Sequence, residues 1–318
     1  MSGSAAATVA PEISLVTPAF NEADNLAALH ERIVAVMEAT GLSWEWIVVD
    51  DHSADTTFAV LSEITARDAR AAGLRLARNF GSHAAILCGL AVARGEAAVV
   101  LAADGQDPPE EIPRLIAAWR AGAAVVWAER RARGNPSLAD QAASRAFHWL
   151  LRRLSGLDTL TRGGSDFFLV SRPVIQIVNS LGERNTNIVA LLAWVGFEQA
   201  AITYDKDLRV AGKSGWNLAK KLKLFLDSII GFSVRPLQAI SVLGFVIALL
   251  GFGYAALVIA NAIFGRPVEG WSSLMVVVLI VGGVQMVMLG ILGEYLWRAL
   301  DESRGRPRYI VERRTDRS

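Results

Sequence analysis

The sequence predicts an α/β domain with a mostly parallel, doubly wound sheet, followed by amphipathic helices at a membrane surface and two transmembrane helices. Short apolar runs alternate with helical stretches from residue 13 onward, as in folds in which each strand is followed by a helix. Two charge-free stretches, 236–265 and 270–293, are each long enough to cross a bilayer. The composition agrees, because 53% of the 318 residues are hydrophobic and the excess lies after residue 236.

The first part of the chain contains four predicted strands, and a helix follows each of the first three. Each apolar run has the length of a strand, and each intervening stretch is longer and helical in character. In chain order the strands and helices are expected at 13–17, 21–40, 46–49, 54–72, 74–76, 82–94 and 97–102.

The elements that follow are a strand at 124–127, a helix at about 138–154, a strand at 167–170 and a helix that opens at Arg172. Further on, Leu218, Leu222 and Phe225 recur at spacings of three and four and are opposed by charged residues. This pattern predicts a basic amphipathic helix that lies in the membrane interface.

These elements divide the chain into five segments. Residues 1–11 are rich in alanine and serine and lack the pattern of a signal peptide, so they are expected to be a disordered lead-in. The remaining segments are a globular domain at 12–212, an amphipathic juxtamembrane region at 213–235, a two-helix transmembrane hairpin at 236–298 and a basic cytoplasmic tail at 299–318.

Basic residues cluster on both sides of the hairpin, although the net charge of the whole chain is only +1. By the positive-inside rule, both flanks and therefore both termini and the globular domain are expected on the cytoplasmic side of the inner membrane. The single cysteine, Cys88, excludes an intrachain disulfide and is consistent with a reducing compartment. The flanking cations are Lys206, Arg209, Lys213, Lys220, Lys221, Lys223 and Arg235 before the hairpin, and Arg298, Arg304, Arg306, Arg308, Arg313 and Arg314 after it.

Polar residues gather where the predicted strands end. In parallel sheets ligands bind at the carboxyl ends of the strands, and an acidic residue there can accept hydrogen bonds from a ribose or a base edge. Asn21, Glu22, Asp50, Asp51 and Asp104 all fall there, together with Pro18. The alternative for the two adjacent aspartates is a helix cap or an Asx turn before the next helix. Glycine-rich phosphate loops are absent from the sequence.

Asp104, Gln106 and Asp107 place hard oxygen donors close together on one loop. Such donors suit Mg²⁺ or Mn²⁺ shared with a substrate diphosphate. The same loop also reads as a turn before a helix that begins with prolines, and the two interpretations are compatible.

Arginines supply the candidate phosphate ligands, because a guanidinium group binds phosphate oxygens through two parallel hydrogen bonds. For each of them a solvated surface role is the alternative. The set comprises Arg130, Arg131, Arg133, Arg145 and Arg209.

Five ordered motifs resemble family 2 glycosyltransferases of the dolichol-phosphate mannose synthase type, and among these the bacterial polyprenyl-phosphate glycosyltransferases with two C-terminal transmembrane helices. The resemblance extends from residue 13 to residue 297 and includes the segment that begins at Gly212 and the end of the second span. The motifs begin at Thr17 (TPAFNE), Val49 (VDDHSAD), Ala77 (ARNFGS), Asp104 (DGQDPPE) and Ala193 (AWVGF).

The resemblance implies a GT-A fold and inverting transfer of a sugar from a UDP- or GDP-sugar to a polyprenyl phosphate such as undecaprenyl phosphate, with Mg²⁺ or Mn²⁺. The product would be a lipid-linked sugar donor for cell-envelope glycans. Carried over by position, Pro18, Phe20, Glu22 and Asp51 would hold the nucleoside and Asp104 and Gln106 the metal, while Asp166, Arg209 and Ser214 match residues of the family's motifs. Together with the residue patterns above, the expected catalytic residues are Asp166 and Asp104, and the expected metal ligands are Asp104, Gln106 and Asp107. The nucleotide-sugar ligands are Pro18, Phe20, Glu22, Asp50, Asp51, Arg78 and Arg209, and the acceptor-phosphate ligands are Arg130, Arg145 and Ser214.

Three residues depart from the pattern of this family: Ala102 replaces an aspartate, Phe168 an arginine and Gly215 a lysine. The alternatives are a processive polysaccharide synthase, whose Gln-x-x-Arg-Trp motif is absent, and a non-catalytic membrane-anchored relative. UDP-linked glucose, galactose or an amino sugar and GDP-mannose are all open as donors. Small residues in the second span predict self-association, and nucleic acid is not an expected partner.

Overall fold

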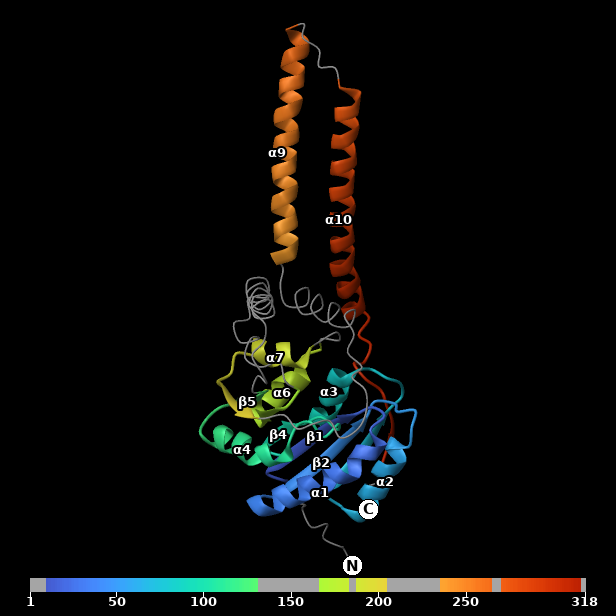
Figure 1. The fold of residues 1–318 in the computed structure, drawn as a ribbon, viewed down its shortest axis with the longest axis vertical. Helices are drawn as coiled ribbons and strands as arrows, with labels where there is room; N and C mark the ends of the chain where they lie inside the picture. Colours follow the sequence, from blue (N-terminus) through green and yellow to red (C-terminus); the bar gives the residue numbers. More distant parts are fainter. Residues whose placement is uncertain (1–9, 131–165, 183–186, 205–234, 265–269, 316–318) are drawn as a thin grey trace, which may run out of the picture.

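The computed structural model describes residues 10–130, 166–182, 187–204, 235–264 and 270–315. In this part of the chain a sheet with helices on both faces forms one domain, from which two long helices extend side by side (Figure 1). The lead-in at 1–9, the helix expected at 138–154 and most of the amphipathic region at 213–235 lie outside the described residues.

The described strands form one eight-stranded sheet in the order β7-β5-β6-β4-β1-β2-β3-β8. Strands β4, β1, β2 and β3 are parallel neighbours, and β5 is parallel to β7. Strand β6 is antiparallel to both β4 and β5, and β8 is antiparallel to β3. The strands are β1 (Ile13–Ala19), β2 (Trp44–Asp50), β3 (Ala71–Leu76), β4 (Ala97–Val100), β5 (Val125–Arg130), β6 (Phe168–Ser171), β7 (Gln199–Tyr204) and β8 (Val311–Arg314).

Helices connect the strands and cover both faces of the sheet. After β4, a loop at 101–108 leads to a short 3₁₀ helix, η1 (Pro109–Glu111), in which prolines start the turn. The α-helices of the domain are α1 (Ala23–Thr40), α2 (Thr57–Arg67), α3 (Ser82–Val92), α4 (Ile112–Arg120), α6 (Arg172–Ser180) and α7 (Ile188–Trp194).

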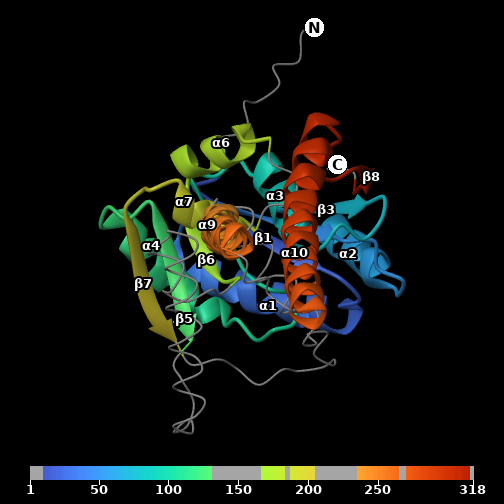
Figure 2. The ribbon, with the colours of Figure 1, turned by 90° about the horizontal axis from the view of Figure 1, so that it is seen from above.

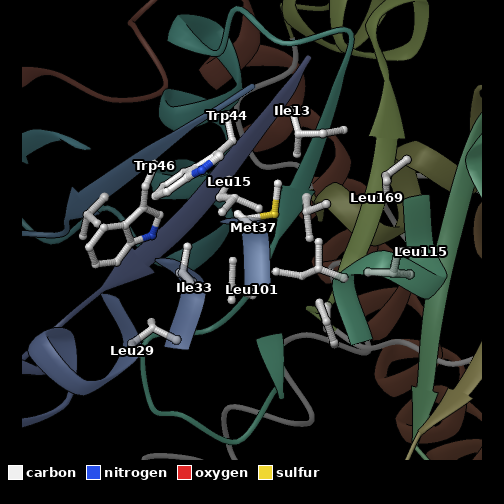
Figure 3. Packing of buried hydrophobic residues seen from close by; sticks show 14 of the residues in the cluster. Ile13, Leu15, Leu29, Ile33, Met37, Trp44, Trp46, Leu101, Leu115 and Leu169 are labelled. Carbon is white, nitrogen blue, oxygen red and sulfur yellow. The ribbon is translucent and has the colours of Figure 1, made fainter. Parts of the chain in front are cut away.

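The central strands are apolar on both faces, and each face packs into its own core. In β2, Trp46 and Val48 belong to one core, whereas Ile47 and Val49 belong to the other, because successive side chains of a strand alternate between faces. Figure 3 shows the first core, in which Ile33 of α1 packs with residues of β1 and β2. Burial on both faces accounts for the near-continuous apolar runs of these strands.

Helix α3 lies very close to the sheet. A methyl group on Gly89 would come within 2.3 Å of Val16 Cγ1 in β1, so only glycine permits this approach.

The helix expected at 54–72 is shorter than predicted. It ends at Arg67, and Ala71 and Ala72 belong to β3, where they pair with Trp46 and Ile47 of β2. The backbone of Asp68 is extended, and its carboxylate accepts a hydrogen bond from Arg70 N at 2.9 Å, which forms a turn. Alanine favours helix, and here strand pairing outweighs that local preference.

Glu45 lies at the edge of the sheet where the parallel strands begin, away from their carboxyl ends. Its side chain is 2% exposed and accepts hydrogen bonds from Ser14 Oγ at 2.8 Å and from Arg94 N at 2.8 Å. The guanidinium of Arg94 donates two more, at 2.8 and 3.0 Å. This cluster satisfies the polar groups buried where β1, β2 and the end of α3 meet.

The two C-terminal helices are α9 (Arg235–Ile263) and α10 (Trp271–Ser303). Within them, Ile240–Asn261 and Ile280–Ser303 are long and apolar enough to cross a membrane, and the most apolar 18-residue stretch of each is not buried in the protein. The second helix ends at Ser303, beyond the predicted end of the hairpin at residue 298.

The basic tail is not separate from the domain, which corrects the expected boundary at 299. Residues 311–314 form β8 and extend the sheet next to β3, as Figure 2 shows. Thr315 Oγ1 accepts a hydrogen bond from Gly73 N at 2.7 Å. The tail has little strand signal of its own, and the open edge of β3 supplies the hydrogen bonds that order it.

Candidate active site

The loops after β1 and β2 lock together at the carboxyl edge of the sheet. Asn21 N donates to Ser53 Oγ at 2.9 Å, and Ala54 N donates to Asn21 Oδ1 at 2.9 Å. Glu22 N also donates to Thr57 Oγ1 at 2.9 Å. Asn21 and His52 have φ angles of 57° and 62°, a conformation uncommon outside glycine that is found mainly where surrounding contacts enforce it.

Asp50 is fully buried, and the protein uses both of its oxygens. Oδ1 accepts from Ser53 N at 2.9 Å, and Oδ2 accepts from Arg75 Nη1 at 3.0 Å. Arg75 also donates to the carbonyl oxygen of Ser53 at 3.0 Å. The structure therefore places Asp50 beneath the candidate nucleotide site, as a support for the loop that follows β2. Its bond to Ser53 N is that of a turn, which agrees with the Asx-turn alternative given for the two adjacent aspartates.

Asp51 holds the loop that connects β3 to α3. Its Oδ1 accepts from Phe80 N at 2.7 Å, and Oδ2 accepts from Gly81 N at 2.8 Å. Burial raises the pKa of Asp51, although these two backbone N–H groups act in the opposite direction. A carboxylate oxygen has more than one lone pair, so Asp51 retains acceptor capacity for a ligand.

Exposed side chains surround these anchored loops. Phe20, directly after β1, is 46% exposed, and Pro18 within β1 is partly exposed. Arg78 is exposed and its guanidinium lies over the ring of Phe80, 4.5 Å from the centroid. An exposed aromatic ring and a cation beside a buried carboxylate suit a base and a phosphate, respectively.

Glu22 lies next to this group but is engaged locally. Its Oε2 accepts from Asn25 Nδ2 at 2.5 Å across the first turn of α1. This contact satisfies part of its carboxylate and fixes the start of the helix.

The structure separates the three candidate metal ligands. Asp104 and Gln106 are partly exposed, and Asp104 Oδ1 accepts from Gln106 N at 3.1 Å, which sets the turn at Gly105. Asp107 is 2% exposed; its oxygens accept from Tyr204 Oη at 2.7 Å and from Ala102 N at 3.3 Å. Asp107 therefore faces the protein interior.

The remaining pair fits a cation that keeps part of its coordination for other oxygens. Mg²⁺ and Mn²⁺ accept carboxylate and amide oxygens, and the other positions are filled by water and substrate phosphate. No cluster of three or more His, Cys, Asp or Glu side chains that could form an all-protein cage occurs among the described residues. Asp104 and Gln106 would thus hold the ion together with a diphosphate.

Asp166 reaches the same edge from a distant part of the sequence. It precedes β6, and Phe168 of β6 lies opposite Val100 at the end of β4, so the start of β6 meets the end of β4. Burial lowers the pKa of His83, and the nearby charge of Asp166 acts in the opposite direction. His83 lies in the first turn of α3, directly after the loop that Asp51 holds.

Of the family departures, Phe168 has a structural explanation. Its ring is fully buried, 5.4 Å from the ring of Trp127, so the position serves the core. The backbone N–H of Ala102 contacts Asp107, as described above. Gly215 lies outside the described residues, as do Arg131, Arg133, Arg145, Arg209 and Ser214. Arg130 ends β5.

Sequence reasoning did not select Arg75, Ser53 or Thr57, although they shape the site. Ser53 and Thr57 lie within the motif that begins at Val49 or just after it, so the motif pointed to their neighbourhood. Arg75 lies in a strand, and a charged residue in an otherwise apolar strand was the available signal.

The fold and the edge residues define a class: an enzyme with a GT-A fold and a candidate nucleotide-sugar site at the carboxyl ends of parallel strands. The model of the family described as glycosyl transferase family 2 matches residues 14–177. The chain belongs to this family and is a glycosyltransferase.

Curated relatives match nearly the whole chain. An uncharacterized glycosyltransferase of Synechocystis sp. is 37% identical and covers 94% of each chain. A bactoprenol glucosyl transferase of Shigella phage SfV is 35% identical over 95% of this chain and 98% of its own. An undecaprenyl-phosphate 4-deoxy-4-formamido-L-arabinose transferase of Edwardsiella ictaluri is 35% identical over 94% of this chain and 93% of its own.

Proposed function

We propose that this glycosyltransferase transfers a sugar from a UDP- or GDP-sugar to a polyprenyl phosphate, such as undecaprenyl phosphate, at a membrane surface. One observation carries the proposal: the similarity to a bactoprenol glucosyl transferase covers 95% of the chain, so it includes both the strand-end site and the two apolar helices. A lipid acceptor explains why a nucleotide-sugar site and apolar helices occur in one chain.

The reaction needs no strong general base, because the phosphate of the acceptor is already anionic. One of its oxygens attacks the anomeric carbon of the sugar from the face opposite the diphosphate. The bond from that carbon to the diphosphate oxygen breaks, and the nucleoside diphosphate leaves with the electron pair, which inverts the configuration. In-line positioning therefore supplies much of the catalysis.

Seven of the described residues have a role in this proposal. Phe20 stacks on the base, Asp51 and Pro18 line the nucleoside, and Arg78 binds phosphate. Asp166 contacts the reacting sugar. Asp104 and Gln106 would hold Mg²⁺ or Mn²⁺, which when bound would neutralise charge on the departing diphosphate.

Release of nucleoside diphosphate tests the proposal directly. The purified full-length protein would be given UDP-glucose, UDP-galactose, UDP-linked amino sugars and GDP-mannose, each with and without undecaprenyl phosphate, in Mg²⁺, Mn²⁺ or EDTA. We expect release with one donor that depends on the lipid and is abolished by EDTA. Release that does not depend on the lipid would refute the acceptor, and EDTA-resistant release would refute the metal.

We further propose that the domain and both termini lie in the cytoplasm and that α9 and α10 form a hairpin across the inner membrane. Cys88 is buried, so it does not compete with an introduced cysteine for a labelling reagent. In intact cells a membrane-impermeant maleimide should label Glu269→Cys but label Arg304→Cys only after lysis. Labelling of Arg304→Cys in intact cells would overturn this topology.

A further inference from the structure

After the second apolar helix, α10, the chain returns to β3, the strand that carries Arg75. Strand β8 pairs with β3, and Ala77 N, at the start of the loop that carries Arg78, donates to the carbonyl oxygen of Ile310 at 2.8 Å. The tail therefore contacts both β3 and the loop that Asp51 holds.

The pairing of β8 contains a bulge at Glu312. Arg75 lies opposite Arg313, but the next residue, Leu76, lies opposite Val311, so Glu312 is the extra residue. A bulge breaks the alternation of a strand and redirects a side chain, and bulges are over-represented next to active sites.

The carboxylate of Glu312 lies near Arg75 of β3 and near His52, in the loop after β2. Glu312 Oε2 lies 3.3 Å from Arg75 Nε and 3.9 Å from His52 Nδ1. The side chain of Arg75 is 19% exposed and its other nitrogens bond to Asp50 and to the carbonyl oxygen of Ser53. Glu312 thus pairs with Nε of Arg75, while the two terminal nitrogens of the same guanidinium bond to Asp50 and to the carbonyl oxygen of Ser53.

The contacts continue to the loop after β1. Ser53, fixed by Asp50 and Arg75, accepts through Oγ from Asn21 N, the residue between Phe20 and Glu22. One continuous set of hydrogen bonds and ion pairs therefore connects the tail that follows α10 with the loop that presents Phe20.

We infer that Glu312 is a positioning residue for nucleotide binding: through Arg75, Asp50 and Ser53 it holds the loops at the ends of β1 and β2 in the geometry that binds the donor. This inference rests on the proposed function, because it takes these loops as the nucleotide site. It assigns a role in donor binding to the segment that follows the second apolar helix.

Nucleotide binding to the full-length protein in detergent tests the inference. Isothermal titration calorimetry with UDP and with GDP, each with Mn²⁺, would compare wild type, Glu312→Gln and Glu312→Ala. We expect about threefold to tenfold weaker binding in the variants, because the loops lose a constraint but keep their own contacts. The matched controls are Glu63→Gln and Glu63→Ala, which remove an exposed carboxylate on α2 that pairs with Arg67 at 4.0 Å. The controls should bind as wild type does.

Kinetics separate positioning from general stability. In Glu312→Ala the KM for the donor should rise by the same factor as the dissociation constant, while kcat and the KM for undecaprenyl phosphate stay within about twofold. Hydrogen exchange at the amides of Asn21 and Ser53 should accelerate in the nucleotide-free variant.

Unchanged nucleotide affinity in Glu312→Ala while wild type binds would overturn the inference, whether or not kcat and the melting temperature fall. If wild type binds neither UDP nor GDP, the proposed function itself fails, and that outcome is distinct from the first.

Discussion

Replacing Asp51 by asparagine should weaken nucleotide binding by releasing the loop that carries Arg78. The carboxylate accepts the N–H groups of Phe80 and Gly81 at 2.7 and 2.8 Å. Asparagine has one carbonyl oxygen, so it can accept one of these hydrogen bonds, and its NH₂ group then faces the other N–H. The substitution keeps the size of the side chain and removes one bond and the charge.

The expected magnitude follows from the bond that is lost. A hydrogen bond to a charged group contributes about 1.5–3 kcal/mol. At about 1.36 kcal/mol per factor of ten, this corresponds to a shift of about 10- to 150-fold between the anchored and the released loop. Apparent affinity falls with the fraction of molecules in the binding-competent state. We therefore expect about tenfold weaker binding, with about 150-fold as the upper bound.

Two measurements on the full-length protein check this. Calorimetry gives the affinity for UDP and GDP, and hydrogen exchange reports the amides of Phe80 and Gly81 without nucleotide, which separates loop anchoring from direct contact with the ligand. Asp24→Asn, at an exposed position in the first turn of α1, is the matched control. Unchanged exchange at both amides in a folded Asp51→Asn protein would refute the reasoning.

Other consequences of the same geometry can be measured separately. Asp104→Ala should abolish metal-dependent turnover and weaken Mn²⁺ binding with little change in melting temperature, because this loop carboxylate is not in the core; retained Mn²⁺ affinity would contradict the assignment. Phe20→Ala should weaken nucleotide binding by about 1–3 kcal/mol, the range for stacking of a base on an aromatic ring, with kcat unchanged. Glu45→Gln should lower the free energy of unfolding by about 1–3 kcal/mol in urea titrations while nucleotide affinity is unchanged, because its bonds lie at the opposite edge of the sheet. Burial raises the pKa of Asp51. The contribution of Asp51 to folding stability is therefore greatest below the ordinary aspartate pKa, and it is lost as pH rises through the raised pKa of the folded state. Anchoring of the loop at Phe80 and Gly81 has the opposite pH dependence, because it needs the ionised carboxylate. Nucleotide affinity should thus fall on acidification, starting at a higher pH than for an ordinary aspartate, and a pH titration of Asp51→Asn should lack this step.

The local pattern of the sequence was sufficient for the order of strands and helices from β1 to β4 and for the two apolar helices. These features depend on near neighbours in the chain, because strand and helix periodicity and the length of an apolar stretch are local properties. The boundary between α2 and β3 was the exception, since pairing with β2 overrode the helical preference of the alanines.

Motifs predicted a site at the carboxyl edge of the sheet but did not distinguish the roles of neighbouring carboxylates. Asp50 and Asp51 are adjacent and chemically identical, yet one binds Arg75 beneath the loop and the other binds the loop before α3. Asp104 and Asp107 divide in the same way, because Asp107 is buried and accepts a hydrogen bond from Tyr204 of β7, whereas Asp104 is partly exposed. Burial and hydrogen-bond partners decide these roles, and both come from segments distant in sequence.

By itself the sequence determined the class of fold and the two helices suited to a membrane, and it predicted a site at the strand ends, because each is encoded in short stretches of chain. Only the tertiary structure decided which carboxylates face the site and that the tail returns to the sheet. Gly73 and Thr315 hydrogen-bond across a separation of 242 residues, and no local pattern carries information over that distance. The contact forms because the unpaired edge of β3 offers N–H and C=O groups that the tail can satisfy.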